Sequence, residues 1–183
     1  MNKLALVLAG MGAFALAIPN APATASMESF EARVAATSAA ATARDDMIAA
    51  FGKSSLKPGK YLWRDVPADA GEERVVVSLG DQLAYLYRGN TLMAVAAIST
   101  GTEKHPTPPG IFQVLEKKTM HHSRKYDNAP MPFMQRIDQY GIALHAGHNP
   151  GHPASHGCIR LPKEFAKKLY SVTDIGTTVM IGA

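Results

Sequence analysis

The chain has 183 residues, and its 19 lysines and arginines against 15 aspartates and glutamates give a formal net charge of +4. This length suits one domain with extensions and excludes two large domains. The positive excess is too small for a nucleic-acid-binding surface, although it is compatible with an anionic polymer as partner. Because Cys158 is the only cysteine, no disulfide can form within the chain.

The first 25 residues predict a secretory signal peptide. A positive start at residues 1–3 is followed by an apolar run over residues 4–18 and then by the small-residue tripeptide Ala23-Thr24-Ala25. This order predicts cleavage after residue 25, with a second candidate position after residue 23. The apolar run is shorter than the roughly 20 residues of a membrane-spanning helix, which disfavours an uncleaved anchor. We therefore expect an exported protein.

Residues 26–73 predict a spacer and linker in front of the folded domain. The stretch 26–57 is rich in alanine and has few larger apolar residues, which predicts a weak helix or a loosely ordered spacer. The stretch 58–73 contains Pro58-Gly59, Pro67 and Gly71, a composition typical of a linker. We therefore place the domain at residues 74–183.

The pattern of residues 74–183 predicts a mainly β single domain. Apolar runs at 75–77, 83–87 and 92–98 are separated by the turns Gly80-Asp81 and Gly89-Asn90, which predicts a meander of three antiparallel strands. One helix is expected to begin at Pro162, because apolar residues follow it at helical spacing. Further strands are expected over residues 111–115, 131–137, 141–144 and 179–181.

A dense group of reactive residue types lies between residues 144 and 161. This stretch holds four of the seven histidines and the only thiol. In an exported protein a lone thiol is buried and inert, paired with another chain, or chemically used. An imidazole can take the proton of Cys158 and create a reactive ion pair, and Gly157 beside it allows close approach of a substrate carbonyl. His145 ends a strand and can return to face Cys158, whereas His156 is too near in sequence to converge easily, so His145 is the better base.

Other roles for these histidines are weaker. His148, His152 and His156 could bind zinc together with Cys158, but their spacing matches no standard zinc pattern. Individually, His148 and His152 are expected to face solvent, and His121-His122 is expected on the surface because polar residues follow it. A papain-like thiol hydrolase is disfavoured, since its cysteine precedes its histidine along the chain.

The segment Ser155-His156-Gly157-Cys158-Ile159-Arg160-Leu161 resembles the Ser/Thr-His-Gly-Cys signature of the L,D-transpeptidase catalytic domain. Three other stretches resemble that family in the same order along the chain: residues 75–87, the Thr-Pro segment 107–112, and residues 131–145. The resemblance covers roughly residues 74–183. It implies a β-sandwich catalytic domain with one or two short helices.

The resemblance also implies an enzyme that cleaves the bond between a diamino acid and the terminal D-Ala of a peptidoglycan tetrapeptide stem. Cys158 would form the thioester, and His145 would move the proton. His156 and Ser155 would support the site, with the N–H groups of Gly157 and Cys158 facing the oxyanion. No metal or organic cofactor is implied.

The resemblance leaves the acceptor open. A second stem would give a cross-link, a lipoprotein lysine would give lipoprotein attachment, and a free D-amino acid would give exchange. Water would give carboxypeptidase activity or lipoprotein detachment. The expected partners are therefore stem peptides, an envelope lipoprotein and carbapenem-type inhibitors. We expect a monomer in the periplasm or cell envelope of a Gram-negative-type bacterium. A non-catalytic, histidine-rich metal-binding envelope protein is the distant alternative.

Two further roles are predicted around this motif. Arg160 and Tyr140 are expected to bind substrate or to brace the loop, with bracing favoured for Arg160 because it lies beyond Cys158. Since Ala146 and Gly147 after His145 have no hydroxyl, a backbone carbonyl is expected to orient the imidazole. The stretch between His145 and the cysteine motif is short for the family, which predicts a reduced or open lid.

Overall fold

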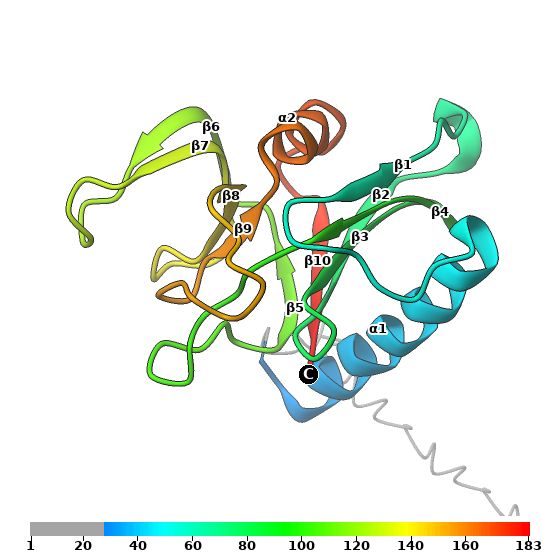
Figure 1. The fold of residues 1–183 in the computed structure, drawn as a ribbon, viewed down its shortest axis with the longest axis horizontal. Coiled ribbons are helices and arrows are strands. Elements are labelled where there is room, and N and C mark those ends of the chain that lie inside the picture. The colour runs from blue at the N-terminus through cyan, green and yellow to red at the C-terminus, as the bar shows by residue number, and fades with distance from the viewer. Residues whose placement is uncertain (1–27) are drawn as a thin grey trace, which may run out of the picture.

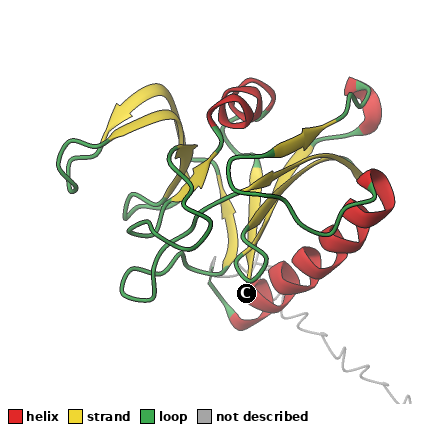
Figure 2. Cartoon of the chain, viewed as in Figure 1, coloured by secondary structure: helices red, strands yellow, loops and turns green. Residues whose placement is uncertain are grey.

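The computed structural model describes residues 28–183, so the predicted signal peptide at residues 1–25 lies outside the described part of the chain. Two β-sheets and two α-helices make up the fold (Figures 1 and 2). The larger sheet contains, in spatial order, β1 (Tyr61–Trp63), β4 (Thr91–Ala97), β3 (Leu83–Arg88), β2 (Glu73–Ser78), β10 (Thr178–Gly182) and β5 (Gly110–Gln113). The smaller sheet contains β6 (Glu116–His122), β7 (Pro130–Arg136), β8 (Ala143–Ala146) and β9 (Ile159–Leu161). The helices are α1 (Phe30–Phe51), α2 (Lys163–Val172) and the short 3-10 helix η1 (Ala68–Ala70).

The predicted mainly β fold class is confirmed, and so is the antiparallel meander, which is β2-β3-β4. Both faces of the larger sheet are buried. On β2, Val75 and Val77 join the cluster that contains residues of β8, β9 and α2, whereas Val76 joins the cluster beneath α1. This alternation follows from the two-residue period of a strand. It explains why β2 is a continuous valine run, and each buried valine stabilises the fold by about 1.5 to 3 kcal/mol.

Of the two alternatives predicted for residues 26–57, a weak helix or a loosely ordered spacer, the structure has the helix: residues 30–51 form a regular helix that lies along one face of the larger sheet (Figure 1). The Ser29 side chain accepts a hydrogen bond from the Ala32 N–H at 3.1 Å and caps the helix. Gly52, with φ +63°, ends it in the left-handed conformation. Neither helix of residues 28–183 has the length and apolar character that crossing a membrane requires.

Small residues, rather than large apolar ones, face the sheet from α1. The buried side chains are those of Ala32, Ala36, Ala40, Ala43 and Met47, at helical spacing. The larger Phe30, Val34 and Ile48 are exposed instead. The alanine face lets α1 approach β10 closely: a Cβ added at Gly182 would lie 2.6 Å from the Ala36 carbonyl oxygen. The segment that is poor in large apolar residues therefore forms a tight helix–sheet interface and is not a spacer.

The predicted linker at residues 58–73 also differs from the structure, since it contains an edge strand of the larger sheet. Strand β1 pairs antiparallel with β4, with Leu62 opposite Val95. The short run Tyr61–Trp63 lies between prolines and charged residues, so no alternating pattern was long enough to predict it.

Strands β6 and β7 form a hairpin that projects from the body of the molecule (Figure 1). Six residue pairs join β6 to β7, whereas only Gln135 and Arg136 of β7 pair with β8. Strand β6 was not predicted because its sequence, Glu-Lys-Lys-Thr-Met-His-His, is polar on both faces. The predicted surface position of His121 is corrected, since it is half-buried and lines the pocket described below.

Candidate active site

Two parallel strands of the smaller sheet bring the predicted nucleophile and base to one face. Strand β8 pairs with β9 so that Leu144 lies opposite Ile159 and His145 lies opposite Arg160. Leu144 and Ile159 are buried in the main core, so the neighbouring side chains on these strands point to the opposite face. Cys158 directly precedes β9 and packs with Ala143, Met131 and Met134 on that opposite face.

A pocket of about 830 Å³ lies on this face of the smaller sheet. One wall comes from the β6–β7 hairpin, and the other comes from β8, β9 and the loops before them. The pocket gathers six of the predicted site residues: Cys158, His145, Ser155, His156, Arg160 and Tyr140. The β6–β7 hairpin therefore forms a wall of the pocket in addition to the short loop after His145.

The imidazole of His145 is buried, with 7% of its surface exposed, and its tautomer is fixed by the backbone. Its Nδ1 lies 2.8 Å from the carbonyl oxygen of Ala146. Because a carbonyl only accepts, Nδ1 carries the proton and Nε2 is left as the basic atom. The predicted backbone carbonyl partner is thereby confirmed. Burial lowers the pKa of His145, the Ala146 carbonyl opposes this, and the nearby Arg160 and His121 lower the pKa further.

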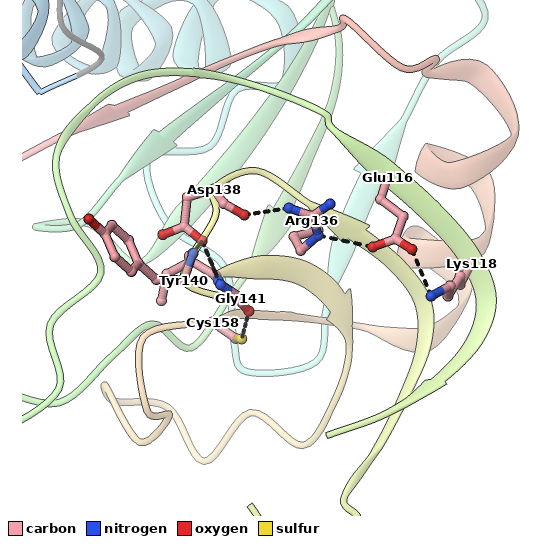
Figure 3. Close-up of polar contacts among 8 residues, drawn as sticks. Glu116, Lys118, Arg136, Asp138, Tyr140, Gly141 and Cys158 are labelled. Atoms are coloured by element: carbon pink, nitrogen blue, oxygen red, sulfur yellow. Dashed lines mark hydrogen bonds and ion pairs between the residues drawn. The ribbon is translucent and has the colours of Figure 1, made fainter. Parts of the chain in front are cut away.

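The thiol of Cys158 points toward the turn between β7 and β8. Its Sγ lies 3.7 Å from the carbonyl oxygen of Gly141, to which the S–H donates (Figure 3). Burial raises the pKa of Cys158, the Asp138 carboxylate raises it further, and the Ala143 N–H and Arg160 lower it. Both shifts therefore favour the neutral form of each group over the charged one.

Ser155 builds the tight turn that presents Cys158. Its buried hydroxyl donates to the Cys158 carbonyl oxygen at 2.6 Å and accepts the Gly157 N–H at 3.1 Å. Gly157 has φ +110°, and a Cβ there would lie 2.4 Å from Cδ1 of Ile142, so only glycine fits. The predicted oxyanion role of the Gly157 N–H is corrected, because that N–H is already engaged by Ser155.

Replacing Ser155 with alanine should lower kcat by about 10-fold and the free energy of unfolding by about 1 to 3 kcal/mol, because two buried hydrogen bonds are lost. Ser155→Thr keeps the hydroxyl and should recover most of the stability. Turnover and thermal unfolding of the three proteins side by side would check this. Wild-type values of both in Ser155→Ala would show that the hydroxyl does not shape the turn.

Thr107 supports the same turn from beneath and was given no role by the sequence analysis. Its Oγ1 donates to the Gly157 carbonyl oxygen at 2.7 Å and accepts the Gly101 N–H at 2.9 Å. The side chain is buried, with 3% of its surface exposed. The Thr-Pro-Pro-Gly run at residues 107–110 was the signal that could have predicted it, since this run brings a hydroxyl to a fixed turn.

His156 supports the site by stacking on neighbouring aromatic rings. Its ring stacks on Tyr126 of the hairpin with centroids 4.3 Å apart and lies 4.8 Å from the ring of His105. This contact ties the β6–β7 hairpin to the cysteine loop. The predicted exposure of His148 and His152 is confirmed.

The histidines and the cysteine that could have bound zinc do not form a metal site in the structure. Within residues 28–183, no three side chains of histidine, cysteine, aspartate or glutamate lie close enough to hold a metal ion. His152 is exposed with Nδ1 3.1 Å from the Pro153 carbonyl oxygen, and His156 is stacked as described.

Comparison with known protein families supports the resemblance seen in the sequence. The family model described as the YkuD L,D-transpeptidase catalytic domain matches residues 72–181, more than half of the chain. The chain belongs to this family. A search of curated proteins found no match.

Solved structures share the L,D-transpeptidase fold. An L,D-transpeptidase from Stackebrandtia nassauensis aligns with a TM-score of 0.57 and 26% identity over 74% of this chain and 64% of its own. L,D-transpeptidase 3 from Mycobacterium tuberculosis, in complex with a faropenem-derived adduct, aligns with a TM-score of 0.57 and 22% identity over 61% of this chain and 60% of its own. An L,D-transpeptidase from Mycobacterium smegmatis aligns with a TM-score of 0.56 and 22% identity over 61% of this chain and 59% of its own. The present chain thus spans about three fifths of the length of these relatives.

Arg160 of this L,D-transpeptidase domain faces the pocket beside His145, not the far side of Cys158. A Cβ at Gly147 would lie 3.0 to 3.2 Å from the side-chain carbons of Arg160, so the arginine stem packs on Gly147. Within residues 28–183 the Arg160 guanidinium donates no hydrogen bond to a side chain or carbonyl and has no carboxylate within 4.0 Å. Tyr140 is 81% exposed at the edge of the pocket.

The pocket of the L,D-transpeptidase domain is strongly basic. Its lining includes one carboxylate, Glu116, against five lysines and arginines, namely Lys118, Arg124, Lys125, Arg136 and Arg160. Glu116 contacts Lys118 at 2.7 Å and Arg136 at 2.9 Å, and these two cations lower its pKa to about 2. The remaining cations leave a positive field over the site.

Proposed function

We propose that this protein is an exported cysteine L,D-transpeptidase that acts on tetrapeptide stems of peptidoglycan. Family membership supports the reaction class. The single observation that carries the assignment is the placement of Cys158 and His145 on one pocket-facing side of adjacent parallel strands. The basic lining of the pocket favours a substrate with ionised carboxylates, as a stem peptide has.

The first half-reaction begins with two neutral groups. Nε2 of His145 takes the thiol proton as Sγ of Cys158 forms a bond to the carbonyl carbon of the diamino acid. The oxygen of that carbonyl becomes an oxyanion, for which the N–H of Cys158 is the donor nearest the nucleophile. When the carbon–nitrogen bond breaks, the amine of D-Ala leaves with the proton from His145, and a thioester remains on Cys158.

The second half-reaction returns the enzyme to its starting state. An acceptor amine attacks the thioester while Nε2 of His145 takes its proton. The carbon–sulfur bond breaks, and the sulfur recovers its proton from His145. With the side-chain amine of a second stem as acceptor the product is a cross-link, and with water the product is a trimmed tripeptide.

The acceptor distinguishes the alternatives within the family. Carboxypeptidase activity and lipoprotein attachment or detachment use the same Cys158 and His145 chemistry. Transpeptidation is favoured here because the pocket continues from Cys158 along the β6–β7 hairpin, which leaves room for a second peptide chain beside the thioester. The location proposed is the periplasm or cell envelope, on the basis of the sequence of residues 1–25.

Arg160 is proposed to bind a carboxylate of the acyl donor. It lies two residues beyond Cys158, and because a strand rises about 3.3 Å per residue, its guanidinium can reach a carboxylate one residue from the scissile bond. A planar guanidinium matches such a group bidentately.

Arg160→Lys is expected to raise KM for the tetrapeptide donor by about 10-fold while kcat and thermal stability change little. Lysine keeps the positive charge but lacks the paired N–H groups with which a guanidinium binds a carboxylate bidentately. Steady-state kinetics and thermal unfolding would measure both, with Arg33→Lys on the exposed part of α1 as the matched control. A loss of stability at unchanged KM would assign Arg160 to bracing the loop instead.

Carbapenem-type inhibitors are proposed to acylate Cys158. Related structures are an imipenem complex of an L,D-transpeptidase and the faropenem-derived adduct of the M. tuberculosis protein. The sulfur attack on a strained carbonyl is chemically the same as the first half-reaction. The basic pocket suits the carboxylate of such a ligand.

The experiment that tests the proposed function incubates the mature protein with purified disaccharide-tetrapeptide and follows the products by mass spectrometry. A cross-linked dimer that has lost one D-Ala establishes transpeptidation, and a tripeptide alone establishes trimming. No reaction with stems, together with turnover of a lipoprotein-linked stem, would move the substrate to the lipoprotein conjugate. No reaction with either substrate would contradict the proposal.

A further inference from the structure

A buried carboxylate, that of Asp138, organises the turn between β7 and β8. Its Oδ1 accepts three consecutive backbone N–H groups, from Tyr140 at 2.9 Å and from Gly141 and Ile142 at 2.8 Å each (Figure 3). Only 8% of the Asp138 surface is exposed. We propose that Asp138 is a positioning residue for the nucleophile, because it shapes the turn that presents a carbonyl and an N–H to the sulfur of Cys158.

Three contacts join this turn to the cysteine loop. The Gly141 carbonyl oxygen accepts the thiol at 3.7 Å, and the Ala143 N–H lowers the pKa of Cys158 and so favours the thiolate. Cδ1 of Ile142 fills the space where Gly157 has no side chain. The sulfur thus has an acceptor for its protonated form and a donor for its ionised form on the same short segment. This inference rests on the proposed function, in which Cys158 is the nucleophile.

The turn is also fixed from the side of the hairpin. Arg136 donates from Nη1 to the backbone carbonyl of Asp138 at 2.7 Å and contacts Glu116 at 2.9 Å through Nε. Lys118 completes the chain by contacting Glu116 at 2.7 Å. Figure 3 shows this series running from the hairpin through Asp138 to Cys158. The base of the hairpin and the nucleophile therefore share one set of polar contacts.

A carboxylate suits this position because one ionised oxygen can accept three N–H groups that converge on it. The same negative charge disfavours the thiolate, and together with burial it raises the pKa of Cys158. Asp138 therefore adds to the effect of burial in favouring the protonated thiol. The other charged or titratable groups that line the pocket with Cys158 are His145, Arg160, His121, His148, His156, Glu116, Lys118, Arg124, Lys125, Arg136, Tyr126 and Tyr140.

The first test changes the charge and keeps the shape. In Asp138→Asn the amide oxygen still accepts the N–H groups, but the negative charge is gone. Because Cys158 is the only cysteine, its iodoacetamide alkylation rate as a function of pH reports thiol ionisation without any substrate. The midpoint should move to lower pH in Asp138→Asn and stay in place in Asp174→Asn, an exposed aspartate outside the pocket. An unchanged midpoint in folded Asp138→Asn would overturn the proposal.

The second test changes only the backbone. Gly141 has φ +100° and Gly176 has φ +94°, and at both positions an added Cβ would meet nothing within 4 Å. Both alanine variants should therefore lose similar thermal stability, because a positive φ is unfavourable for alanine. Only Gly141→Ala should also reorient the carbonyl beside Cys158, lowering kcat on the order of 10- to 100-fold with little change in KM.

Equal kcat losses in Gly141→Ala and Gly176→Ala would show that the turn acts on stability alone and would overturn the proposal. The two tests separate this inference from the proposed function. If the wild-type protein turned over no stem peptide, the alkylation midpoints would still decide whether Asp138 acts on the sulfur.

Discussion

Replacing Cys158 with serine should lower kcat on stem tetrapeptide by at least about a thousand-fold. A serine hydroxyl must lose its proton to a neutral imidazole at a site where burial already disfavours charge on the nucleophile. The hydroxyl is also smaller than the thiol that reaches toward Gly141. Product formation measured by mass spectrometry at saturating donor, with both proteins at equal concentration, gives the ratio.

The control for this prediction is Cys158→Ala, which removes the nucleophile without offering another. Both variants should keep the wild-type circular dichroism spectrum and thermal midpoint, since Cys158 packs at the edge of a small cluster and not in the main core. A serine variant with more than about a tenth of the wild-type kcat would contradict the prediction, and the same activity in Cys158→Ala would mean that another group attacks the substrate.

His145→Gln is expected to lower kcat by about a hundred- to ten-thousand-fold, because the amide fits the space but takes no proton from the thiol. The pH profile gives a second readout. In the wild-type protein the acid limb of kcat/KM reports protonation of the free base. Since burial lowers the pKa of His145, the base stays neutral at pH values where an exposed histidine is already charged. Activity should therefore persist below pH 6.5, the ordinary pKa of histidine, and fall only at more acidic pH.

The same shift predicts how stability depends on pH. The unfolded chain binds a proton at His145 before the folded protein does, so the stability that the neutral imidazole contributes is present above the ordinary histidine pKa. It is lost as pH falls through the lower pKa of the folded state. The difference in thermal midpoint between the wild-type and His145→Gln proteins should therefore be smaller at acidic pH than at neutral pH. An acid limb of activity above pH 6.5 would contradict the lowered pKa of His145.

Residues near the nucleophile were predictable because their chemistry is local. The run from Ser155 to Leu161 specifies a turn, a thiol and a strand within a few residues, and His145 ends a recognisable apolar stretch. The meander was equally accessible, because its strands alternate and its turns contain glycine. In each case neighbouring residues suffice to define the element.

Features that depend on distant partners were not predictable from pattern. The alanines of α1 form an interface only because β10 offers Gly182 against Ala36. Strand β6 is polar and is a strand only because β7 pairs with it. Asp138 is an ordinary polar residue in the sequence, and its role comes from hydrogen bonds within a turn that the fold brings beside Cys158. These contacts join residues that no local pattern connects.

The position of β10 determines when the fold can be completed during synthesis. This strand pairs in parallel with β2 and antiparallel with β5, so residues 178–182 fill the gap between two parts of the larger sheet. Helix α1, from the other end of the described chain, packs on the same strand. A nascent chain that emerges N-terminus first therefore holds α1 and β2 with their apolar faces open until these late residues arrive. Residues 178–182 must therefore be synthesised before the larger sheet can be completed.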